Sequence, residues 1–328
     1  MKFGFFVSPQ FTADQDMSQA VANMSEQVRI ARATGFESVW VPQHLLTHPM
    51  RMFQPHELLA RLSANAEGMR LGTGILLLSM LNPVAVAEQA VTLDWMSEGG
   101  YVLAAGMGYR NAEFQAMGIP MKQRVGRLVE AVELIRRLWR EERVTHHGKY
   151  FTVEDCGLSL RPRRPEGCSL WVGGAVEPAI ERAAKIADAW LGSFTSDIPA
   201  LSAMYQTYRG ARPAEVTDIP EMPLCRECFV GETESAARGH ARGPIISKYA
   251  AYDSWDNKLS GGLSNSFDAE CDDKFIIGDA AHVRDLIARY RDELGVSTLI
   301  LRMSWPGLDH ARTRSSIERF GAIIRDFA

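Results

Sequence analysis

The segment GGYVLAAGMGYRNAEF, residues 99–114, decides between two fold classes. An apolar run, 101–105, leads into the turn Gly106-Met107-Gly108 and then into a segment of helix-like composition. This order is typical of the strand, turn and helix that open a dinucleotide-binding unit. The third glycine of that motif is missing, and the first apolar strand of the chain leads into Ser8-Pro9-Gln10 where such a unit would have its glycine turn. The segment therefore disfavours a nicotinamide site of the doubly wound type.

Outward from this segment, the chain alternates between strand-like and helix-like patterns. Short apolar runs are read as strands and apolar residues at spacings of three and four as helices. We predict strands at 2–7, 38–41, 70–78, 101–106, 169–174, 189–193, 224–231 and 297–303. We predict helices at 14–34, 54–64, 83–96, 122–141, 176–187, 199–208, 280–294 and 311–327, with one more at 232–252 that Gly243-Pro244 interrupts.

Eight strands that alternate with helices indicate a parallel sheet. In 328 residues without a dividing linker, this pattern favours a single domain, residues 1–328, with an α/β fold: a (β/α)8 TIM barrel with insertions. One insertion, 144–160, is expected to form a small hairpin or an irregular excursion. Another, the polar and glycine-rich segment 253–274, is a predicted lid over the barrel mouth, where Trp255 and Phe267 would line an apolar pocket.

Composition narrows the function classes. The formal net charge is −4, with no basic stripe, which disfavours a nucleic-acid partner. No apolar run reaches the roughly 18 residues needed to span a bilayer, so no membrane association is expected. The five cysteines are scattered and odd in number, which favours reduced thiols and a cytoplasmic location. No metal site is predicted, because the HLLTH run at 44–48 lacks the glutamate of a zinc-protease helix.

Six stretches, in order, resemble one known family. They are GFESVWVPQH (35–44), LGTGILLLSMLNPVAVAEQAVTLDWMSEGG (71–100), LAAGMGYRNAEF (103–114), GKYF (148–151), LWVGGAVEPAIERAAKIADAWL (170–191) and the Gly278-Asp279 pair that opens a late helix. Each stretch is a weak marker by itself, but their order is specific. Over about residues 2–326 the chain resembles the bacterial luciferase-like flavin-dependent monooxygenases.

The resemblance implies a luciferase-like TIM barrel that binds reduced flavin mononucleotide (FMN). The implied function is a two-component flavoprotein monooxygenase: a separate NAD(P)H-dependent reductase supplies reduced flavin, O2 reacts to form a C4a-(hydro)peroxyflavin, and a small organic substrate is oxygenated. A homodimer is also implied. Two alternatives stay open. One is hydride transfer with the deazaflavin coenzyme F420, and the other is a non-catalytic flavin-binding barrel.

The resemblance also suggests roles for particular residues. His44 would assist flavin chemistry as a proton donor, which suits an imidazole near neutral pH. Glu113 would act as an acid in the deazaflavin branch, and Arg226 would contact substrate or peroxide. The implied cofactor-binding residues are Gln10, Thr73, Gly74, Ile75, Met107, Gly108, Tyr109, Arg110, Gly173, Gly174, Ala175 and Val176. Gly74-Ile75 is the candidate for a non-prolyl cis peptide behind the flavin ring, and Gly173 to Val176 is the candidate phosphate site.

Three positions depart from the family pattern. Met107 stands where the family frequently has arginine, and Ala175 and Val176 replace a hydroxyl residue common in that turn. Both changes weaken the expected phosphate site, although Arg110 is a candidate to compensate. The reactive cysteine of true luciferases corresponds to Gly106, which argues against light emission. The sequence leaves open the substrate, the choice between FMN and a deazaflavin, and the dimer interface.

Overall fold

The structure is a computed structural model that describes residues 1–192, 194–216, 221–255 and 266–327. Its centre is a parallel sheet with the strand order β10-β9-β6-β5-β3-β1-β13-β11-β12. The bounds are β1 Lys2–Phe6, β3 Ser38–Val41, β5 Arg70–Thr73, β6 Tyr101–Ala105, β9 Ser169–Gly173, β10 Ala189–Leu191, β11 Pro223–Val230, β12 Ile276–Gly278 and β13 Thr298–Arg302. Every paired neighbour in this sheet runs parallel, as the alternation of strands and helices predicts.

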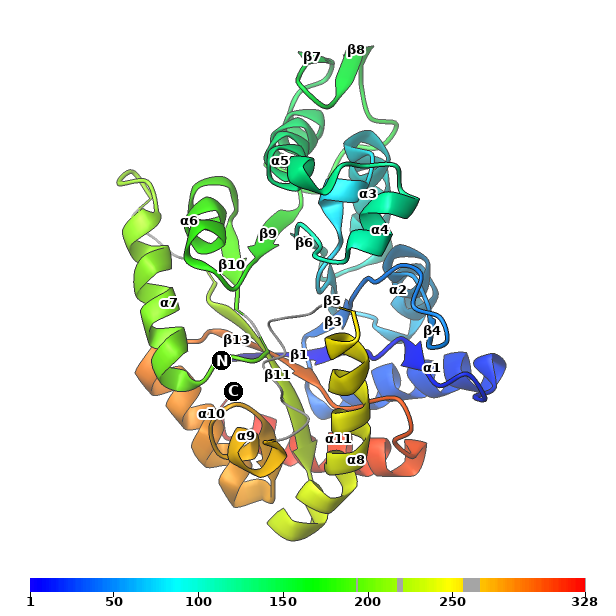
Figure 1. The fold of residues 1–328 in the computed structure, drawn as a ribbon, viewed down its shortest axis with the longest axis vertical. Coiled ribbons are helices and arrows are strands. Elements are labelled where there is room, and N and C mark those ends of the chain that lie inside the picture. Colours follow the sequence, from blue (N-terminus) through cyan, green and yellow to red (C-terminus); the bar gives the residue numbers. More distant parts are fainter. Residues whose placement is uncertain (193, 217–220, 256–265, 328) are drawn as a thin grey trace.

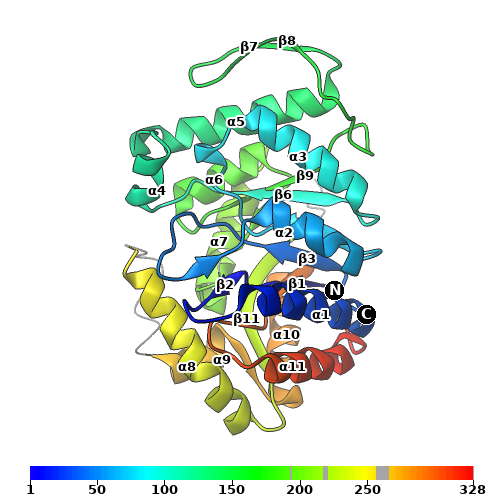
Figure 2. The same ribbon diagram turned by 90° about the vertical axis from the view of Figure 1, so that its right-hand side faces the viewer.

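Helices surround this sheet (Figure 1). They are α1 Met17–Thr34, α2 Pro55–Leu62, α3 Pro83–Met96, α4 Asn111–Ala116, α5 Arg124–Arg140, α6 Glu177–Ile186, α7 Ile198–Ala211, α8 Glu234–Asp253, α9 Phe267–Asp273, α10 Ala280–Leu294 and α11 His310–Ile324. Two small antiparallel pairs complete the fold: β2 Gln10–Phe11 with β4 Arg51–Met52, and β7 Val144–His147 with β8 Thr152–Cys156. The β7–β8 hairpin projects at the end of the molecule opposite α8 and α9 in both views (Figure 2).

The sheet is curled. Beyond β10, Gly192 makes an isolated parallel bridge to Leu224 of β11, with its amide 3.1 Å from the carbonyl oxygen of Pro223. The side chains on the inner face form a separate apolar cluster, in which Trp40 and Trp171 stack with ring centroids 4.9 Å apart. A curled parallel sheet with an outer layer of helices agrees with the predicted fold class. Complete closure into a (β/α)8 barrel, and the treatment of the whole chain as one domain, stay predictions.

Three predictions about secondary structure were wrong. The sheet has a ninth strand, β12, whose three residues are too few to give a clear apolar period. The predicted strand at 70–78 ends at Thr73 and is followed by a 3-10 turn at Leu78–Met80. Helix α8 continues through Pro244 because its buried face, which recurs every three to four residues, packs against the sheet. The predicted hairpin at 144–160 is confirmed.

The predicted lid lies partly outside the described residues, since 256–265 are not described. Of the remainder, Trp255 follows α8, and Phe267 begins α9. Phe267 is buried and belongs to an apolar cluster with Phe229 and Phe275, so it packs the helix down and does not line the candidate site described below. Within the described parts of the chain, no helix has both the length and the apolar character needed to cross a membrane.

Candidate functional site

The exits of three neighbouring strands converge on Ile75. The peptide bond between Gly74 and Ile75, directly after β5, is cis, as predicted. A Cβ atom at Gly106, after β6, would lie 2.0 Å from Cδ1 of Ile75, and one at Gly173, the last residue of β9, would lie 3.3 Å from Cγ2 of Ile75. The side chain of Ile75 therefore occupies the space beside Gly106, which the sequence alone did not indicate. The three exits form one surface at the carboxyl ends of the strands, where parallel α/β folds bind ligands.

His44 lies beside this surface, in the loop after β3, and aromatic rings enclose it. The centroid of its imidazole is 5.8 Å from that of Tyr109, 5.5 Å from that of Tyr252 and 5.5 Å from that of Trp255. Its side chain is 12% exposed. Tyr252 lies in the last turn of α8 and Trp255 follows that helix, so a segment distant in sequence covers a histidine that the sequence analysis placed at a strand end. Such an enclosure limits the access of water to the imidazole.

Glu113 and Arg110 hold the His44 loop in place. Glu113 is fully buried; its Oε1 lies 3.4 Å from Nδ1 of His44 and accepts a 2.8 Å hydrogen bond from the Leu45 amide. Arg110 forms a 3.3 Å ion pair with the same oxygen and donates to the carbonyl oxygens of Leu45 at 2.6 Å and Leu46 at 3.3 Å. The second carboxylate oxygen, Oε2, is buried without a hydrogen-bond partner among the described residues. The segment after β6 thus supplies a buried acid and holds the loop after β3 in place.

Three further residues that were predicted to bind the cofactor, Gln10, Thr73 and Gly108, have different roles in the structure. Gln10, in β2, is buried and donates from Nε2 to the hydroxyl of Tyr252 at 3.0 Å, so it lies at the candidate site. Thr73 is also buried, but its hydroxyl donates to the carbonyl oxygen of Ala104 and accepts from the amide of the same residue. Thr73 therefore joins β5 to β6. Gly108 has a φ of 75°, a conformation that glycine adopts readily and that turns the chain toward α4.

The candidate phosphate turn, Gly173 to Val176, leads into α6, which has no side-chain N-cap hydrogen bond. A nearby cation that the sequence analysis did not identify is Arg182, in the second turn of α6. Its Nη1 lies 3.7 Å from the sulfur of Met107, and the described residues give it no carboxylate partner. Burial lowers the pKa of Arg182. An arginine thus lies beside the position where the family pattern led us to expect one.

The prediction that Arg226 contacts substrate is not supported by its position. Arg226 is fully buried, donates from Nε to the hydroxyl of Tyr290 in α10 at 2.9 Å, and donates from Nη2 to the carbonyl oxygen of Ser196 at 2.6 Å. It lies between the sheet and the outer helices, whereas Cys225 belongs to the inner cluster. Side chains alternate along a strand, so the residues at 225 and 227 share the inner face and 226 does not.

The inner-facing residue is Glu227, and it anchors a buried polar cluster that the sequence analysis missed. Its Oε1 accepts hydrogen bonds from Lys248 of α8, from the Tyr249 hydroxyl at 2.8 Å and from Nη1 of Arg302 in β13 at 3.2 Å. Its Oε2 accepts a 2.5 Å bond from the indole of Trp305. The available sequence signal was a pair of charged residues inside the otherwise apolar strands LCRECFV and TLILRM. Assigning them to the inner face required the register of the sheet.

Burial and mutual charge shift the pKa values of this cluster. Burial alone would raise the pKa of Glu227, but the cations of Lys248 and Arg302 more than offset it and hold that pKa below its usual value. Burial, reinforced by Arg302, lowers the pKa of Lys248 to about 7, although Glu227 opposes the shift. Lys248 is therefore poised to gain or lose a proton near neutral pH.

This geometry can be compared with known proteins. A sequence profile described as luciferase-like monooxygenase matches residues 1–298. The chain belongs to the luciferase-like monooxygenase family. The resemblance inferred from six short stretches is confirmed.

Curated relatives of this luciferase-like chain fall into two groups. It is 31% identical over 179 residues to 4-hydroxyprotoasukamycin monooxygenase of Streptomyces nodosus, covering 54% of this chain and 48% of that protein. It is 30% identical over 183 residues to an F420-dependent glucose-6-phosphate dehydrogenase of Kineococcus radiotolerans, covering 53% and 51%. The chain spans about half the length of these relatives. One relative is named as a monooxygenase and the other as an F420-dependent dehydrogenase.

Solved structures with a similar fold also include a monooxygenase and an F420-dependent dehydrogenase. The monooxygenase RslO1 of Streptomyces bottropensis superposes with a TM-score of 0.84 at 22% identity, with all of both chains covered. An F420-dependent secondary alcohol dehydrogenase superposes with a TM-score of 0.81 at 19% identity, over 100% of this chain and 99% of that one. At these identities the superpositions establish the luciferase-like fold and leave the reaction undecided.

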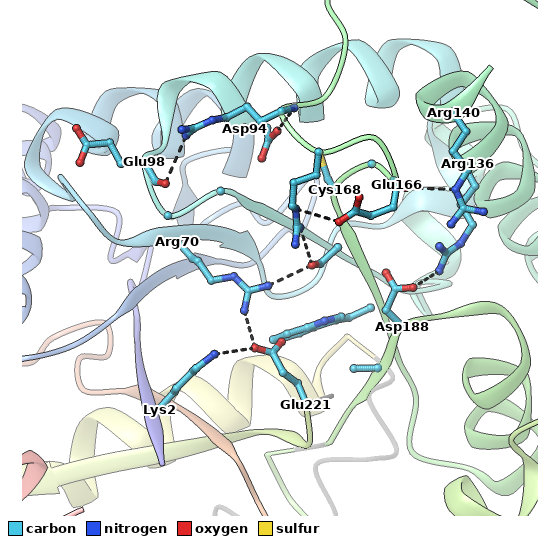
Figure 3. Close-up of a pocket in the computed structure, with 18 residues that line it drawn as sticks. Lys2, Arg70, Asp94, Glu98, Arg136, Arg140, Glu166, Cys168, Asp188 and Glu221 are labelled. Carbon is cyan, nitrogen blue, oxygen red and sulfur yellow. Dashed lines mark hydrogen bonds and ion pairs between the residues drawn. The ribbon is translucent and has the colours of Figure 1, made fainter. Parts of the chain in front are cut away.

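A cavity of about 840 Å3 lies at the opposite end of the luciferase-like sheet, where the strands begin (Figure 3). Several of its charged groups form ion pairs: Arg70 with Glu221 at 2.7 Å, Lys2 with Glu221 at 3.5 Å, and Arg136 with Asp188 at 2.7 Å. In parallel barrels this end contributes to stability, while chemistry takes place at the other end. We therefore assign the candidate site to the His44 surface even though the amino-end cavity is large.

Proposed function

We propose that this protein is a flavin-dependent monooxygenase that takes reduced FMN from a separate reductase and uses O2 to oxygenate a small organic substrate. The observation that carries the proposal is the enclosure of His44 by the rings of Tyr109, Tyr252 and Trp255. Oxygen activation on a reduced flavin requires a site from which water is excluded, since water promotes the unproductive release of peroxide. A proton donor in an aromatic enclosure meets that requirement.

The residues present fit a flavin-type cofactor. The uncapped N-terminus of α6 offers backbone amides to a phosphate, and Arg182 offers a positive charge beside Met107. The backbone at Gly74-Ile75 would support the ring system between the exits of β5 and β6. The orphaned Oε2 of Glu113 and the partly enclosed His44 supply polar atoms that a bound molecule could satisfy. When bound, the cofactor supplies the electrons that activate O2.

The protein's own groups then have distinct tasks. His44 holds or releases a proton at its imidazole. Glu113 and Arg110 fix the loop that carries this imidazole, through the Leu45 amide and the carbonyl oxygens of Leu45 and Leu46. The rings of Tyr252 and Trp255 exclude water from the imidazole of His44. We further propose a homodimer and a closed barrel, on the basis of family membership.

A second candidate function is hydride transfer with coenzyme F420. It is favoured by the buried carboxylate of Glu113, 3.4 Å from His44, because an acid and an imidazole in contact suit the protonation changes of alcohol or sugar oxidation. It also agrees with the F420-dependent enzymes among the relatives. This candidate needs neither O2 nor a reductase.

The deciding experiment is anaerobic titration of the purified protein with reduced FMN and, in parallel, with reduced F420, followed by mixing with O2. Tight binding of reduced FMN, with reoxidation slower than that of the free flavin, supports the monooxygenase. Binding of F420 alone, with indifference to O2, replaces it with the hydride-transfer function. Flavin binding without reaction under any condition supports a non-catalytic barrel.

A further inference from the structure

A cluster of buried charges, Glu227, Lys248 and Arg302, lies beside Tyr252 on the inner side of the sheet. The mechanism proposed above does not use these charges. Glu227 is 0% exposed, Lys248 1% and Arg302 4%. Tyr252 joins this cluster to the His44 surface: its ring centroid is 5.3 Å from Nζ of Lys248 and 5.5 Å from the His44 ring. The two groups of residues therefore belong to one continuous interior.

The carboxylate of this cluster is saturated, whereas the cations are not. Glu227 accepts four hydrogen bonds, from Lys248, Tyr249, Arg302 and Trp305. Arg302 donates to Glu227 and also hydrogen-bonds Tyr252, but its Nε is buried with no hydrogen-bond partner in the described part of the chain. The ammonium of Lys248 has three donors, and its contact with Glu227 uses one of them. Donor capacity is left over on the cations only.

The net charge of the cluster also indicates that its cations lack a full set of partners. Two cations and one carboxylate leave one positive charge in surroundings made of aromatic rings. The guanidinium of Arg302 lies 4.3 Å from the centroid of Phe6 and 4.5 Å from that of Phe194, and Nζ of Lys248 lies 4.3 Å from that of Tyr249. A buried charge without a partner is costly, and it is relieved either by loss of a proton or by an incoming anion. The low pKa of Lys248, about 7, places the protein between these two states.

From this arrangement we infer that Lys248 and Arg302 bind an acidic oxygen of the substrate, carried on a flat aromatic body. The rings of Phe6, Phe194 and Tyr252 supply the apolar walls, and the two cations supply the only uncompensated charge in the cluster as described. The inference rests on the proposed function, in which this interior holds the substrate. It adds the substrate class: aromatic molecules with a carboxylate or another acidic oxygen.

The test compares benzoate with benzamide, which have the same shape but differ in charge. Calorimetric titration is carried out on the protein with and without FMN, at mildly acidic pH, where Lys248 is protonated. We expect benzoate to bind about tenfold more tightly than benzamide, the ratio that one charge-assisted contact provides. Equal affinities, or no binding of either compound, would overturn the inference.

Two variants test the assignment to particular residues. Lys248→Met leaves Glu227 paired with Arg302, and Arg302→Gln leaves it paired with Lys248, so each variant keeps a balanced ion pair and should fold. Each should reduce the benzoate preference to less than about threefold. Lys2→Gln, which removes a cation at the far end of the sheet, should leave the preference intact. A preference that survives in both interior variants contradicts the inference.

The outcome is separable from that of the proposed function. Titration of the same three variants with FMN reports on the cofactor site, and we expect FMN affinity within about threefold of wild type in each. If neither FMN nor F420 binds while the benzoate preference is present, the proposed function fails and the anion site stands. If FMN binds and reacts but benzoate and benzamide are not distinguished, the anion site fails alone.

Discussion

The two ends of the sheet handle charge in opposite ways. At the amino end, the cavity of about 840 Å3 is lined by cations and carboxylates, several of which form partly exposed pairs, as Arg70 and Glu221 do (Figure 3). At the carboxyl end, the charges are buried, cations outnumber carboxylates around Glu227, and Glu113 keeps an unsatisfied oxygen. The comparison teaches that cavity volume is a poor guide to function here. The ion pairs at the amino end stay partly open to water, whereas the proposed site keeps buried polar atoms that have no hydrogen-bond partner among the described residues.

The sharpest test of this contrast is Glu227→Leu, which leaves Lys248 and Arg302 buried without a counter-ion. Removing one partner from a buried ion pair typically costs about 3–5 kcal/mol. We expect a loss of that size in the free energy of unfolding, measured by urea denaturation monitored by circular dichroism. A loss below about 1 kcal/mol would mean that the carboxyl-end charges are as well solvated as those of the amino end.

The next effect concerns the chemical step. Replacing His44 by alanine removes the proposed proton donor but leaves Glu113 bonded to the Leu45 amide and to Arg110. General acid–base catalysis contributes about 10²-fold or more, so we expect at least that loss in the single-turnover rate with the bound cofactor. Cofactor affinity, measured by fluorescence titration, should change less than about threefold. An equal loss in affinity and rate would make His44 a binding residue.

The charge excess also predicts a pH dependence. The native pKa of Lys248 is about 7 and the ordinary pKa of a lysine is 10.5, so between these values the unfolded chain holds a proton that the native chain has lost. This group therefore makes stability rise with pH above 7, by about 1 kcal/mol from pH 7 to 8. The measurement is the difference in unfolding free energy between wild type and Lys248→Met across that range. The variant removes the contribution of Lys248 to this pH dependence. The buried tyrosines and thiols contribute to the pH dependence of both proteins, so their effect cancels in the difference.

A smaller effect is expected at the phosphate turn. If Arg182 replaces the arginine that is missing at position 107, then Arg182→Gln should weaken FMN binding by about tenfold. Riboflavin lacks the phosphate, so its affinity should not change. Fluorescence quenching titrations with both flavins provide the comparison. If the variant weakens both equally, Arg182 supports the turn structurally and the α6 amides bind the phosphate without it.

Much of the fold was predictable because buried parallel strands are nearly continuous apolar runs. The eight predicted strands are all present, and the cis peptide at Gly74-Ile75 followed from the family pattern. Strand β12 was not predictable, since its three residues gain their structure from pairing with β11. Nor was the continuity of α8 through Pro244, which depends on the tertiary packing of that helix.

The site was predictable where one strand exit determines it and unpredictable where several elements meet. The positions of His44, Glu113 and Arg110 follow from the ends of β3 and β6, and the structure brings all three together. The choice of Arg226 over Glu227 failed because the two adjacent residues point to opposite faces, and only the sheet register identifies the inner one. Lys248 approaches from a helix that follows β11, a contact no spacing rule encodes.

The smallest expected effect completes the comparison at the amino end. Glu221 pairs with Arg70 and Lys2, whose side chains are 22% and 54% exposed. Water can solvate both cations once the carboxylate is removed, and exposed ion pairs contribute about 0–1 kcal/mol. We therefore expect Glu221→Gln to lower the free energy of unfolding by less than about 1 kcal/mol and to leave FMN and benzoate binding unchanged. A loss approaching that of Glu227→Leu would show that the amino-end charges are also structurally essential, and the contrast between the two ends would then rest on function alone.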